Sequence, residues 1–395
     1  MMPPKLPIYL DYNATTPVDA RVLEAMLPYF TGKFGNAASR SHAFGWTAEE
    51  AVKMAREQVA ALIGAVPEEI IFTSGATEAC NLALKGVFEA YAAKGNHIIT
   101  CTTEHKAVLD TCRHLEKMGA QVTYLPVNTD GLIDLDELEN AITEQTLLIA
   151  IMYANNETGI LQPISEIGAL AKKHGVLFCS DATQALGKIP VDVQQDGIDL
   201  MAFSAHKMYG PKGVGALYVR RRNPRVRLTA QMDGGGHERG MRSGTLNVPG
   251  IVGLGQAATI AKEEMAEDAA RLESLRARLE QALLALGGVS VNGQGARRLA
   301  HVSNLSFSGV ESEALMLYLA KDMALSSGSA CTSATLAPSH VLKAMGLSDE
   351  AAFSSLRFSL GRFTTEPEIN YAIEKISTSV AALRGISQVA TAKFN

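Results

Sequence analysis

Between residues 69 and 219 the sequence alternates short apolar runs with amphipathic stretches, and this alternation constrains the fold more than any other feature. The apolar runs have the length of buried strands, and the stretches between them carry apolar residues at helical spacing. Strands are predicted at 69–72, 97–101, 121–125, 147–152, 175–179, 200–203 and 214–219, and helices at 17–29, 47–63, 77–92, 105–118 and 163–174. The first helix is expected to begin at Pro17, because proline suits a first helical position. Strands that alternate with helices form a mostly parallel sheet covered on both faces, so the sequence predicts an α/β fold.

The remainder of the chain predicts a second, smaller domain. One long amphipathic helix is expected from about 250 to 286. Shorter strands with helices between them follow, at about 289, 302–307, 323–326 and 356–360. We therefore predict a large α/β domain at 16–259 and a small α+β domain formed by 1–15 and 260–395.

Length, composition and charge limit the class of protein. A chain of 395 residues is long enough for two domains, and 47% hydrophobic and 19% charged residues are typical of a globular protein. A net charge of −5 predicts no binding to nucleic acid or to an anionic membrane. The five cysteines show no paired spacing, which predicts neither a disulfide framework nor a zinc site and fits a reducing compartment. Without a signal-like or membrane-spanning segment, the protein is expected to be cytoplasmic.

Two charged residues stand where predicted strands end. Lys207 follows the strand at 200–203, and Asp181 follows the strand at 175–179. Ligands of open α/β sheets bind where strands end, and a lysine there can form a Schiff base with a carbonyl cofactor. Pyridoxal phosphate needs such a lysine together with an acid opposite its ring nitrogen. Either residue alone is more simply a surface charge, but the pair predicts a pyridoxal phosphate site.

Polar residues near these positions could hold the phosphate of this cofactor. Ala76 and Thr77 lie between a strand and a helix, where backbone N–H groups and the helix dipole favour an anion. A plain helix cap is the alternative for this stretch. Ser204 and His206 lie beside Lys207 and could donate hydrogen bonds to the same phosphate.

Three further residues could contact the cofactor ring. His105 opens a helix after a predicted strand, where its imidazole could stack on the ring and move protons, or bond locally to the helix. Asn156 follows another strand and could bond the phenolic oxygen of the ring, as could Gln184. The alternative for the asparagine stretch is an ordinary turn.

The C-terminal third contains a candidate nucleophile and a candidate substrate ligand. Cys331 lies among small residues in a loop at about 324–338 that is expected to be mobile, and a thiol there could act as a nucleophile. Arg357 alternates with apolar neighbours and could hold a substrate carboxylate by two parallel hydrogen bonds, or form a surface ion pair. Four cysteines in apolar patterns and six histidines without ligand-like grouping are predicted to be structural: Cys80, Cys101, Cys112, Cys179, His42, His97, His114, His174, His237 and His301.

Taken together, these motifs resemble those of the cysteine desulfurases of the IscS/NifS type, which are pyridoxal phosphate enzymes of fold type I. The likeness extends over nearly the whole chain. The motifs that carry it are Thr73-Ser-Gly-Ala-Thr-Glu, Thr103-Glu-His-Lys-Ala-Val, Asp181-Ala-Thr-Gln, Ser204-Ala-His-Lys, Gly235-Gly-His-Glu-Arg-Gly-Met-Arg-Ser-Gly-Thr and Ser326-Ser-Gly-Ser-Ala-Cys-Thr-Ser.

The resemblance implies a role for each candidate residue. Lys207 would bond the cofactor aldehyde, Asp181 would pair with the ring nitrogen and His105 would stack on the ring. The resemblance also implies phosphate ligands (Ala76, Thr77, Ser204, His206), ligands of the ring oxygen (Asn156, Gln184), and Thr245 reaching the phosphate from the neighbouring subunit of a homodimer.

The resemblance further implies a reaction. Arg357 would bind the carboxylate of L-cysteine, and Asn156 would also contact the substrate. Cys331 would take the sulfur as a persulfide while L-alanine leaves. The sulfur would pass to an iron–sulfur scaffold or another acceptor protein. No metal site is expected, although Cys331 could be a transient iron–sulfur ligand. The alternatives are a selenocysteine lyase or another pyridoxal phosphate enzyme of this fold, and a non-catalytic sulfur-relay protein.

Overall fold

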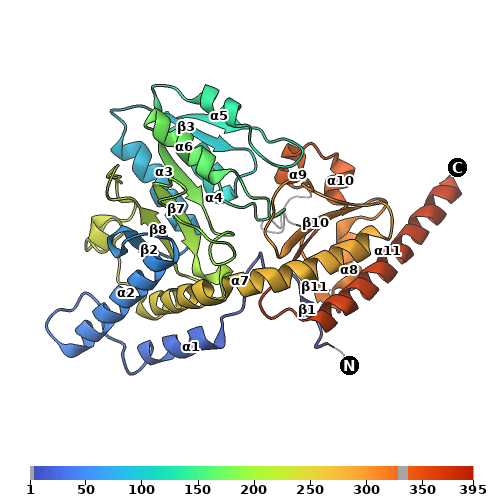
Figure 1. Cartoon of the computed structure of the whole chain (residues 1–395), viewed down its shortest axis with the longest axis horizontal. Coiled ribbons are helices and arrows are strands. Elements are labelled where there is room, and N and C mark those ends of the chain that lie inside the picture. The colour runs from blue at the N-terminus through green and yellow to red at the C-terminus, as the bar shows by residue number, and fades with distance from the viewer. Residues whose placement is uncertain (1–3, 328–336, 395) are drawn as a thin grey trace.

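The computed structural model describes residues 4–327 and 337–394, and its centre is a seven-stranded sheet in the order β2-β8-β7-β6-β5-β3-β4 (Figure 1). Its strands are β2 (Ile70–Thr73), β3 (His97–Cys101), β4 (Gln121–Leu125), β5 (Thr146–Ala150), β6 (Leu177–Asp181), β7 (Leu200–Ser204) and β8 (Gly215–Val219). Strand β8 is antiparallel to both of its neighbours, β2 and β7, and the other paired strands of this sheet are parallel. The link from β7 to β8 is too short for the helical crossover that a parallel pair needs. The predicted mostly parallel α/β sheet is confirmed.

Helices cover both faces of this sheet (Figure 1). They include α2 (Ala43–Leu62), α3 (Ala76–Ala90), α4 (Lys106–Lys117), α5 (Leu135–Ala141), α6 (Ile164–His174) and the start of α7 (Val248–Leu284). Successive strand residues point to opposite faces, so Met201 packs in the core beneath α2, α6 and α7, and Ala202 packs in the core beneath α3 and α4. Burial on both faces explains why inner strands such as β5 and β7 are almost entirely apolar.

A second sheet lies in the C-terminal part of the chain, in the order β12-β10-β9, and all its neighbours are antiparallel. Its strands are β9 (Val289–Val291), β10 (Val302–Phe307) and β12 (Ser355–Ser359). Strand β1 (Ile8–Tyr9) pairs with β11 (Met323–Ala324) nearby. The helices of this part are α8 (Ser312–Leu319), α9 (His340–Ala344), α10 (Asp349–Phe353) and α11 (Glu366–Phe394). Ile8 packs in the core of this part, so the N-terminal strand belongs to it.

Helix α7 connects the two cores. Its buried residues up to Ala261 pack against the seven-stranded sheet, and those from Leu272 onward pack in the C-terminal core. The predicted domain boundary at 259/260 lies just before this change of partner. The division into two domains itself remains a prediction.

The first helix begins later than the sequence predicts. Helix α1 (Ala20–Met26) is capped by Asp19, whose carboxylate accepts a hydrogen bond from the N–H of Arg21. Pro17 therefore lies outside the helix, and the expectation that it opens the helix is wrong. A side chain that accepts a backbone hydrogen bond satisfies a free N–H group, which a proline cannot do.

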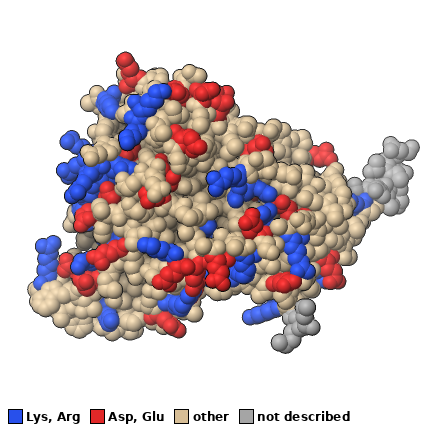
Figure 2. Space-filling model, in the orientation of Figure 1, with Lys and Arg blue, Asp and Glu red and all other residues tan. Residues whose placement is uncertain are grey.

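The surface carries both signs of charge. On the face shown in Figure 2, basic and acidic side chains lie among one another, in keeping with a net charge of −5. Among the described residues, no helix is long and apolar enough to cross a membrane. Residues 4–327 and 337–394 contain no group of three or more side chains suited to holding a metal ion.

Candidate active site

A cavity of about 720 Å³ lies at the edge of the seven-stranded sheet where the parallel strands end. Ten of the predicted site residues line it: Ala76, Thr77, His105, Asn156, Asp181, Gln184, Ser204, His206, Lys207 and Arg357. Parallel strands present their carboxyl ends at one sheet edge, which explains why residues so far apart in sequence meet here. Thr245 is exposed and does not line this cavity, and Cys331 lies outside the described residues.

Lys207 and Asp181 come from adjacent strands. Lys207 ends the short 3-10 turn η3 (Ala205–Lys207) after β7, and Asp181 ends β6, which pairs directly with β7. The Lys207 ammonium donates to the backbone carbonyls of Asn13, at 2.5 Å, and Ala14, at 2.7 Å. The Asp181 carboxylate accepts a hydrogen bond from the N–H of Thr183 at 3.0 Å. A cation and a carboxylate thus reach one cavity from neighbouring strand ends.

The N-terminus of α3 forms the second part of the cavity. Its N-cap is Gly75, which makes no side-chain capping bond, so the alternative of a plain helix cap by a side chain is wrong. The first N–H groups of a helix have no acceptor within it, and they favour an anion. A side chain at Gly215 of β8 would come within 2.7 Å of the Gly75 Cα atom, so glycine at 215 lets this turn pack against the sheet.

An ion pair between Glu78 and Arg242 lies beside the N-terminus of α3. The Glu78 carboxylate accepts from the N–H of Ser74 at 2.7 Å and pairs with Arg242 at 2.7 Å. Burial disfavours the charge on Glu78, but the hydrogen bonds from Arg242 and Ser74 outweigh burial and lower its pKa. Arg242 therefore neutralises the Glu78 carboxylate beside the candidate phosphate site.

His206 contributes a neutral ring. Burial, followed by the charges of Lys207 and Lys212, lowers the pKa of His206 to about 4. Its Nδ1 atom lies 3.0 Å from the Thr15 hydroxyl. A neutral imidazole keeps one N–H donor, which suits a hydrogen bond to a phosphate oxygen.

Arg357 enters the cavity from β12 and is only 4% exposed. Its guanidinium pairs with Asp11 at 2.7 Å and donates to the Asn156 carbonyl at 2.8 Å. The alternative of a surface ion pair is wrong, because Arg357 is buried and its partner Asp11 is partly buried. Its strand neighbours Leu356 and Phe358 pack in the C-terminal core, as the predicted alternation requires.

Buried polar atoms without partners provide a test of whether a polar ligand fits. Within the part of the chain that the structure describes, the Gln184 Oε1, Thr183 Oγ1 and Arg357 Nε atoms are buried and have no hydrogen-bond partner. Such atoms nearly always find partners in folded proteins. With the lysine, the carboxylate and the open helix N-terminus, they form a donor and acceptor set that fits pyridoxal phosphate and an amino-acid substrate.

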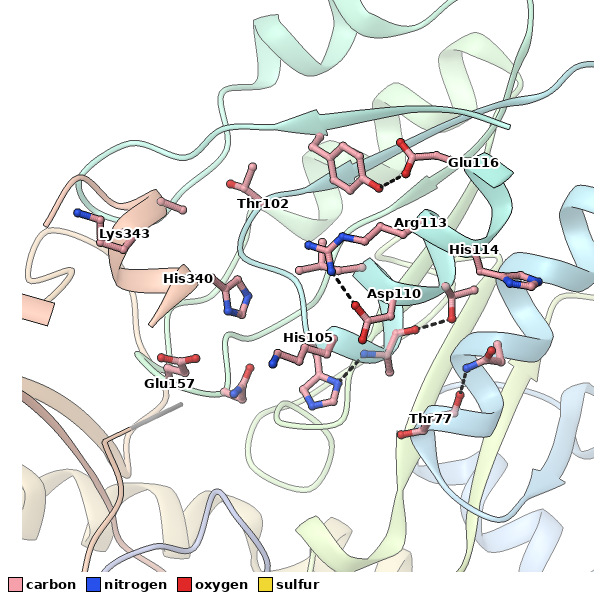
Figure 3. Close-up of a pocket in the computed structure, with 18 of the residues that line it drawn as sticks. Thr77, Thr102, His105, Asp110, Arg113, His114, Glu116, Glu157, His340 and Lys343 are labelled. Atoms are coloured by element: carbon pink, nitrogen blue, oxygen red, sulfur yellow. Dashed lines mark hydrogen bonds and ion pairs between the residues drawn. The ribbon is translucent and has the colours of Figure 1, made fainter. Parts of the chain in front are cut away.

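A larger cavity of about 1250 Å³ adjoins the first (Figure 3). The two share Thr77, His105, Ala107 and Asn156. His105 caps α4 by accepting from the N–H of Ala107 at 3.1 Å, and Figure 3 shows it between Glu157 and Asp110. The predicted local bond of His105 is therefore present, and the ring also lines both cavities.

Several residues near the cavities escaped the sequence analysis. His340 of α9 lies 3.1 Å from the Glu104 carbonyl, and the Ser339 hydroxyl donates to the Glu157 carboxylate at 2.5 Å. Burial raises the pKa of both carboxyls, that of Glu104 strongly. Glu104 and Glu157 adjoin His105 and Asn156 in sequence, which was a usable signal. Asp11 and Asn13 gave no such local signal.

The four other cysteines are buried. Burial raises the pKa of Cys101 to about 11 and that of Cys112 to about 12, and it also raises the pKa values of Cys80 and Cys179. A thiol must ionise to act as a nucleophile, so these residues are structural, as predicted.

The fold and the cavity together are those of an α/β enzyme that depends on pyridoxal phosphate. The chain belongs to the aminotransferase class-V family, which it matches over residues 8–371, and within it to the cysteine desulfurases. It is 60% identical to the cysteine desulfurase IscS of Anaeromyxobacter sp. (strain Fw109-5) over 97% of this chain and 95% of that protein. The IscS protein of Proteus mirabilis (strain HI4320) is also 60% identical, with the same coverage.

Solved structures show the same likeness. A NifS-like protein superposes with a TM-score of 0.89 at 40% identity, over 95% of this chain and all of that one. A structure described as SspA in complex with cysteine superposes with a TM-score of 0.80 at 39% identity, over 91% of this chain and all of that one. The fold type predicted from the sequence motifs is confirmed.

Proposed function

We propose that this protein is a cysteine desulfurase that converts L-cysteine to L-alanine and transfers the sulfur to Cys331. The observation that carries the proposal is the meeting of Lys207, Asp181 and Arg357 in one cavity. These residues supply the amine, the carboxylate and the guanidinium that a pyridoxal phosphate enzyme needs for an amino acid. Relatives at 60% identity that bear the name cysteine desulfurase support this reaction.

Each of these cavity residues would have a separate role in the reaction. Bound pyridoxal phosphate supplies an electron sink for negative charge at the substrate Cα atom. Asp181 keeps the ring nitrogen protonated, and the N-terminus of α3 holds the phosphate with Ser204 and His206. Arg357 holds the substrate carboxylate, and the Lys207 amine removes the proton from Cα.

The remaining residues would orient the ring. His105 lines both cavities, where its imidazole can stack on the ring and exchange protons with the substrate. The amide of Gln184 donates to the Asn13 carbonyl at 3.0 Å and still has a second N–H for the ring oxygen. Asn156 lines the same wall and is assigned to the same oxygen.

Sulfur transfer would take place on Cys331. Its thiolate attacks the substrate sulfur, an S–S bond forms as the C–S bond breaks, and a proton then completes alanine. The described residues on either side support this assignment, because the Ser326 carbonyl accepts from the N–H of Arg357 at 2.7 Å and Pro338 lines the larger cavity. Only four residues separate Cys331 from Ser326 in the sequence, and five steps along the chain span at most about 18 Å.

We also propose that the enzyme is a homodimer in which Thr245 reaches the phosphate of the neighbouring subunit. Thr245 is exposed on its own subunit. Large apolar side chains are exposed on α1, α2 and the loop between them, with Phe34 64% exposed and Trp46 55% exposed. Exposed apolar patches of this kind mark protein interfaces. Delivery of sulfur in the cytoplasm to an iron–sulfur scaffold or another acceptor belongs to the same proposal.

The proposal is tested by the colour of the protein and by alanine release. With its cofactor bound, the purified wild type should absorb light at about 400 nm. It should also release alanine from cysteine. Lys207→Ala should lose both properties, and Cys331→Ala should keep the band and lose cysteine turnover. Cys112→Ala is the matched control and should keep both. A colourless wild type would exclude the cofactor, and turnover by Cys331→Ala would exclude the persulfide step.

A further inference from the structure

The N-terminal segment around Asn13 runs between the two sheets and touches the candidate site on both sides. On one side the N–H of Tyr12 donates to the carbonyl of Ser359 in β12, and on the other the N–H of Thr16 donates to the carbonyl of His206. Asn13 lies between these contacts and is only 1% exposed. It therefore sits where the cofactor half of the site meets the half that carries Arg357.

The backbone of Asn13 holds two side chains of the cofactor half. Its carbonyl oxygen accepts from the Lys207 ammonium at 2.5 Å and from the Gln184 amide at 3.0 Å. Its N–H donates to the Ser359 hydroxyl at 2.9 Å. A shift of this backbone would move the acceptor for both Lys207 and Gln184.

The side chain of Asn13 holds the other half. Its Nδ2 atom donates to the Asn156 carbonyl at 3.0 Å, and the same carbonyl accepts from Arg357 at 2.8 Å. Its Oδ1 atom lies 2.9 Å from Nε2 of His301. One amide thus connects Asn156, which Arg357 also contacts, to a buried histidine.

The hydrogen-bond partners fix the tautomer of His301. The Asn156 carbonyl can only accept, so the Asn13 amide must present Nδ2 to it and Oδ1 to His301. Because an amide oxygen only accepts, Nε2 of His301 must carry a proton. Burial lowers the pKa of His301 well below its usual value, so the ring is neutral and Nε2–H is its single donor.

We propose that Asn13 is a positioning residue for the desulfurase reaction and that His301 acts on the site through it. The inference rests on the proposed function, because it concerns the alignment of Lys207 with Arg357. Asn13 sets the spacing between the amine that takes the Cα proton and the guanidinium that holds the carboxylate. Misplacement of reacting groups by about 1 Å can cost roughly 100-fold in rate. His301 had been predicted to be structural only.

A double-mutant cycle on the holoenzyme tests this connection. We expect Asn13→Ala to lower kcat for cysteine by about 10- to 100-fold and to shift the visible band, and His301→Leu to do the same to a smaller extent. If His301 acts through Asn13, the double variant should be no slower than Asn13→Ala alone, because coupled residues are not additive. Two losses that multiply in the double variant would overturn the proposal.

Two nearly isosteric variants separate positioning from packing. Asn13→Asp keeps the shape but places an acceptor against the Asn156 carbonyl, so we expect it to lose as much kcat as Asn13→Ala. His301→Gln can still donate to Oδ1 and should recover most of the kcat that His301→Leu loses. Wild-type kcat in Asn13→Asp, or no recovery in His301→Gln, would count against the proposal.

A matched control and a spectroscopic measurement complete the test. His97 is also a buried histidine, bonded to Thr146 and Thr123 at the opposite edge of the sheet, so His97→Leu should lower the melting temperature and leave kcat unchanged. Nitrogen-15 NMR of the holoenzyme should find His301 protonated at Nε2, and protonation at Nδ1 would overturn the inference without any activity measurement. If the wild type itself does not turn over cysteine, the proposed function fails instead.

Discussion

The two adjoining cavities share four residues but differ in how their charged side chains are held. In the smaller cavity Arg357 is buried in an ion pair with Asp11, and Lys207 donates to two backbone carbonyls. In the larger cavity Glu157 is buried, but most of the charged side chains lie on α4 and α9, where Arg113 pairs with Asp110 while both side chains are 61% exposed.

This difference shows where the chemistry can take place. Charges held in fixed positions away from water stabilise a transition state without having to reorganise, whereas exposed pairs contribute about 0 to 1 kcal/mol. We therefore infer that the smaller cavity is suited to catalysis and that the larger one gives access to it. This contrast can be tested by substitution, and the largest effect is expected in the smaller cavity.

Removal of the buried guanidinium should have the largest effect. Arg357→Ala should lower kcat/KM for cysteine roughly 10- to 150-fold. This loss corresponds to about 1.5 to 3 kcal/mol of binding free energy, because a charge-assisted bond to the substrate carboxylate is lost. Steady-state kinetics would measure the loss, and a melting curve would separate it from unfolding caused by the unpaired Asp11. Unchanged kinetics in a folded variant would remove Arg357 from the site.

Arg357 also shows which features of the site can be predicted from the sequence and which cannot. Alternation with Leu356 and Phe358 was enough to predict which way its side chain points. The buried ion pair could not be predicted, because Asp11 lies 346 residues away. For the same reason Asn13 escaped notice, since its contacts with Lys207 and His301 span 194 and 288 residues.

The fold was easier to predict from the sequence than these contacts, because the sequence patterns that predict it are local. The inner strands of the central sheet are apolar runs, and the rule that ligands bind at strand ends then selected several of the residues that line the smaller cavity. The seven-residue helix α5 was missed, because it is too short for a helical period to stand out. The start of α1 was misplaced, because Asp19 and Pro17 both suit a helix start and only one can cap it.

A smaller effect is expected from the neutral ring of His206. Its pKa is lowered to about 4, against about 6.5 when unfolded, so the unfolded chain binds the proton more tightly. The free energy of unfolding of the cofactor-free protein should therefore fall as the pH drops from about 6.5 to about 4, by about 1 to 2 kcal/mol after allowance for solvent screening. Urea unfolding at several pH values should show a shallower fall for His206→Gln. Parallel curves would show that this ring is not held neutral.

The smallest effect is expected in the larger cavity. Arg113→Ala removes an exposed charge and leaves Asp110 in water, so kcat/KM for cysteine should change by no more than about twofold, and the free energy of unfolding by less than about 0.5 kcal/mol. Lys343→Ala of α9 is the matched variant on the opposite wall and should behave alike, since its pair with Asp349 is also exposed. A tenfold loss in either variant would mean that this wall contacts the substrate or the sulfur carrier directly. The contrast between a cavity for catalysis and a cavity for access would then be wrong.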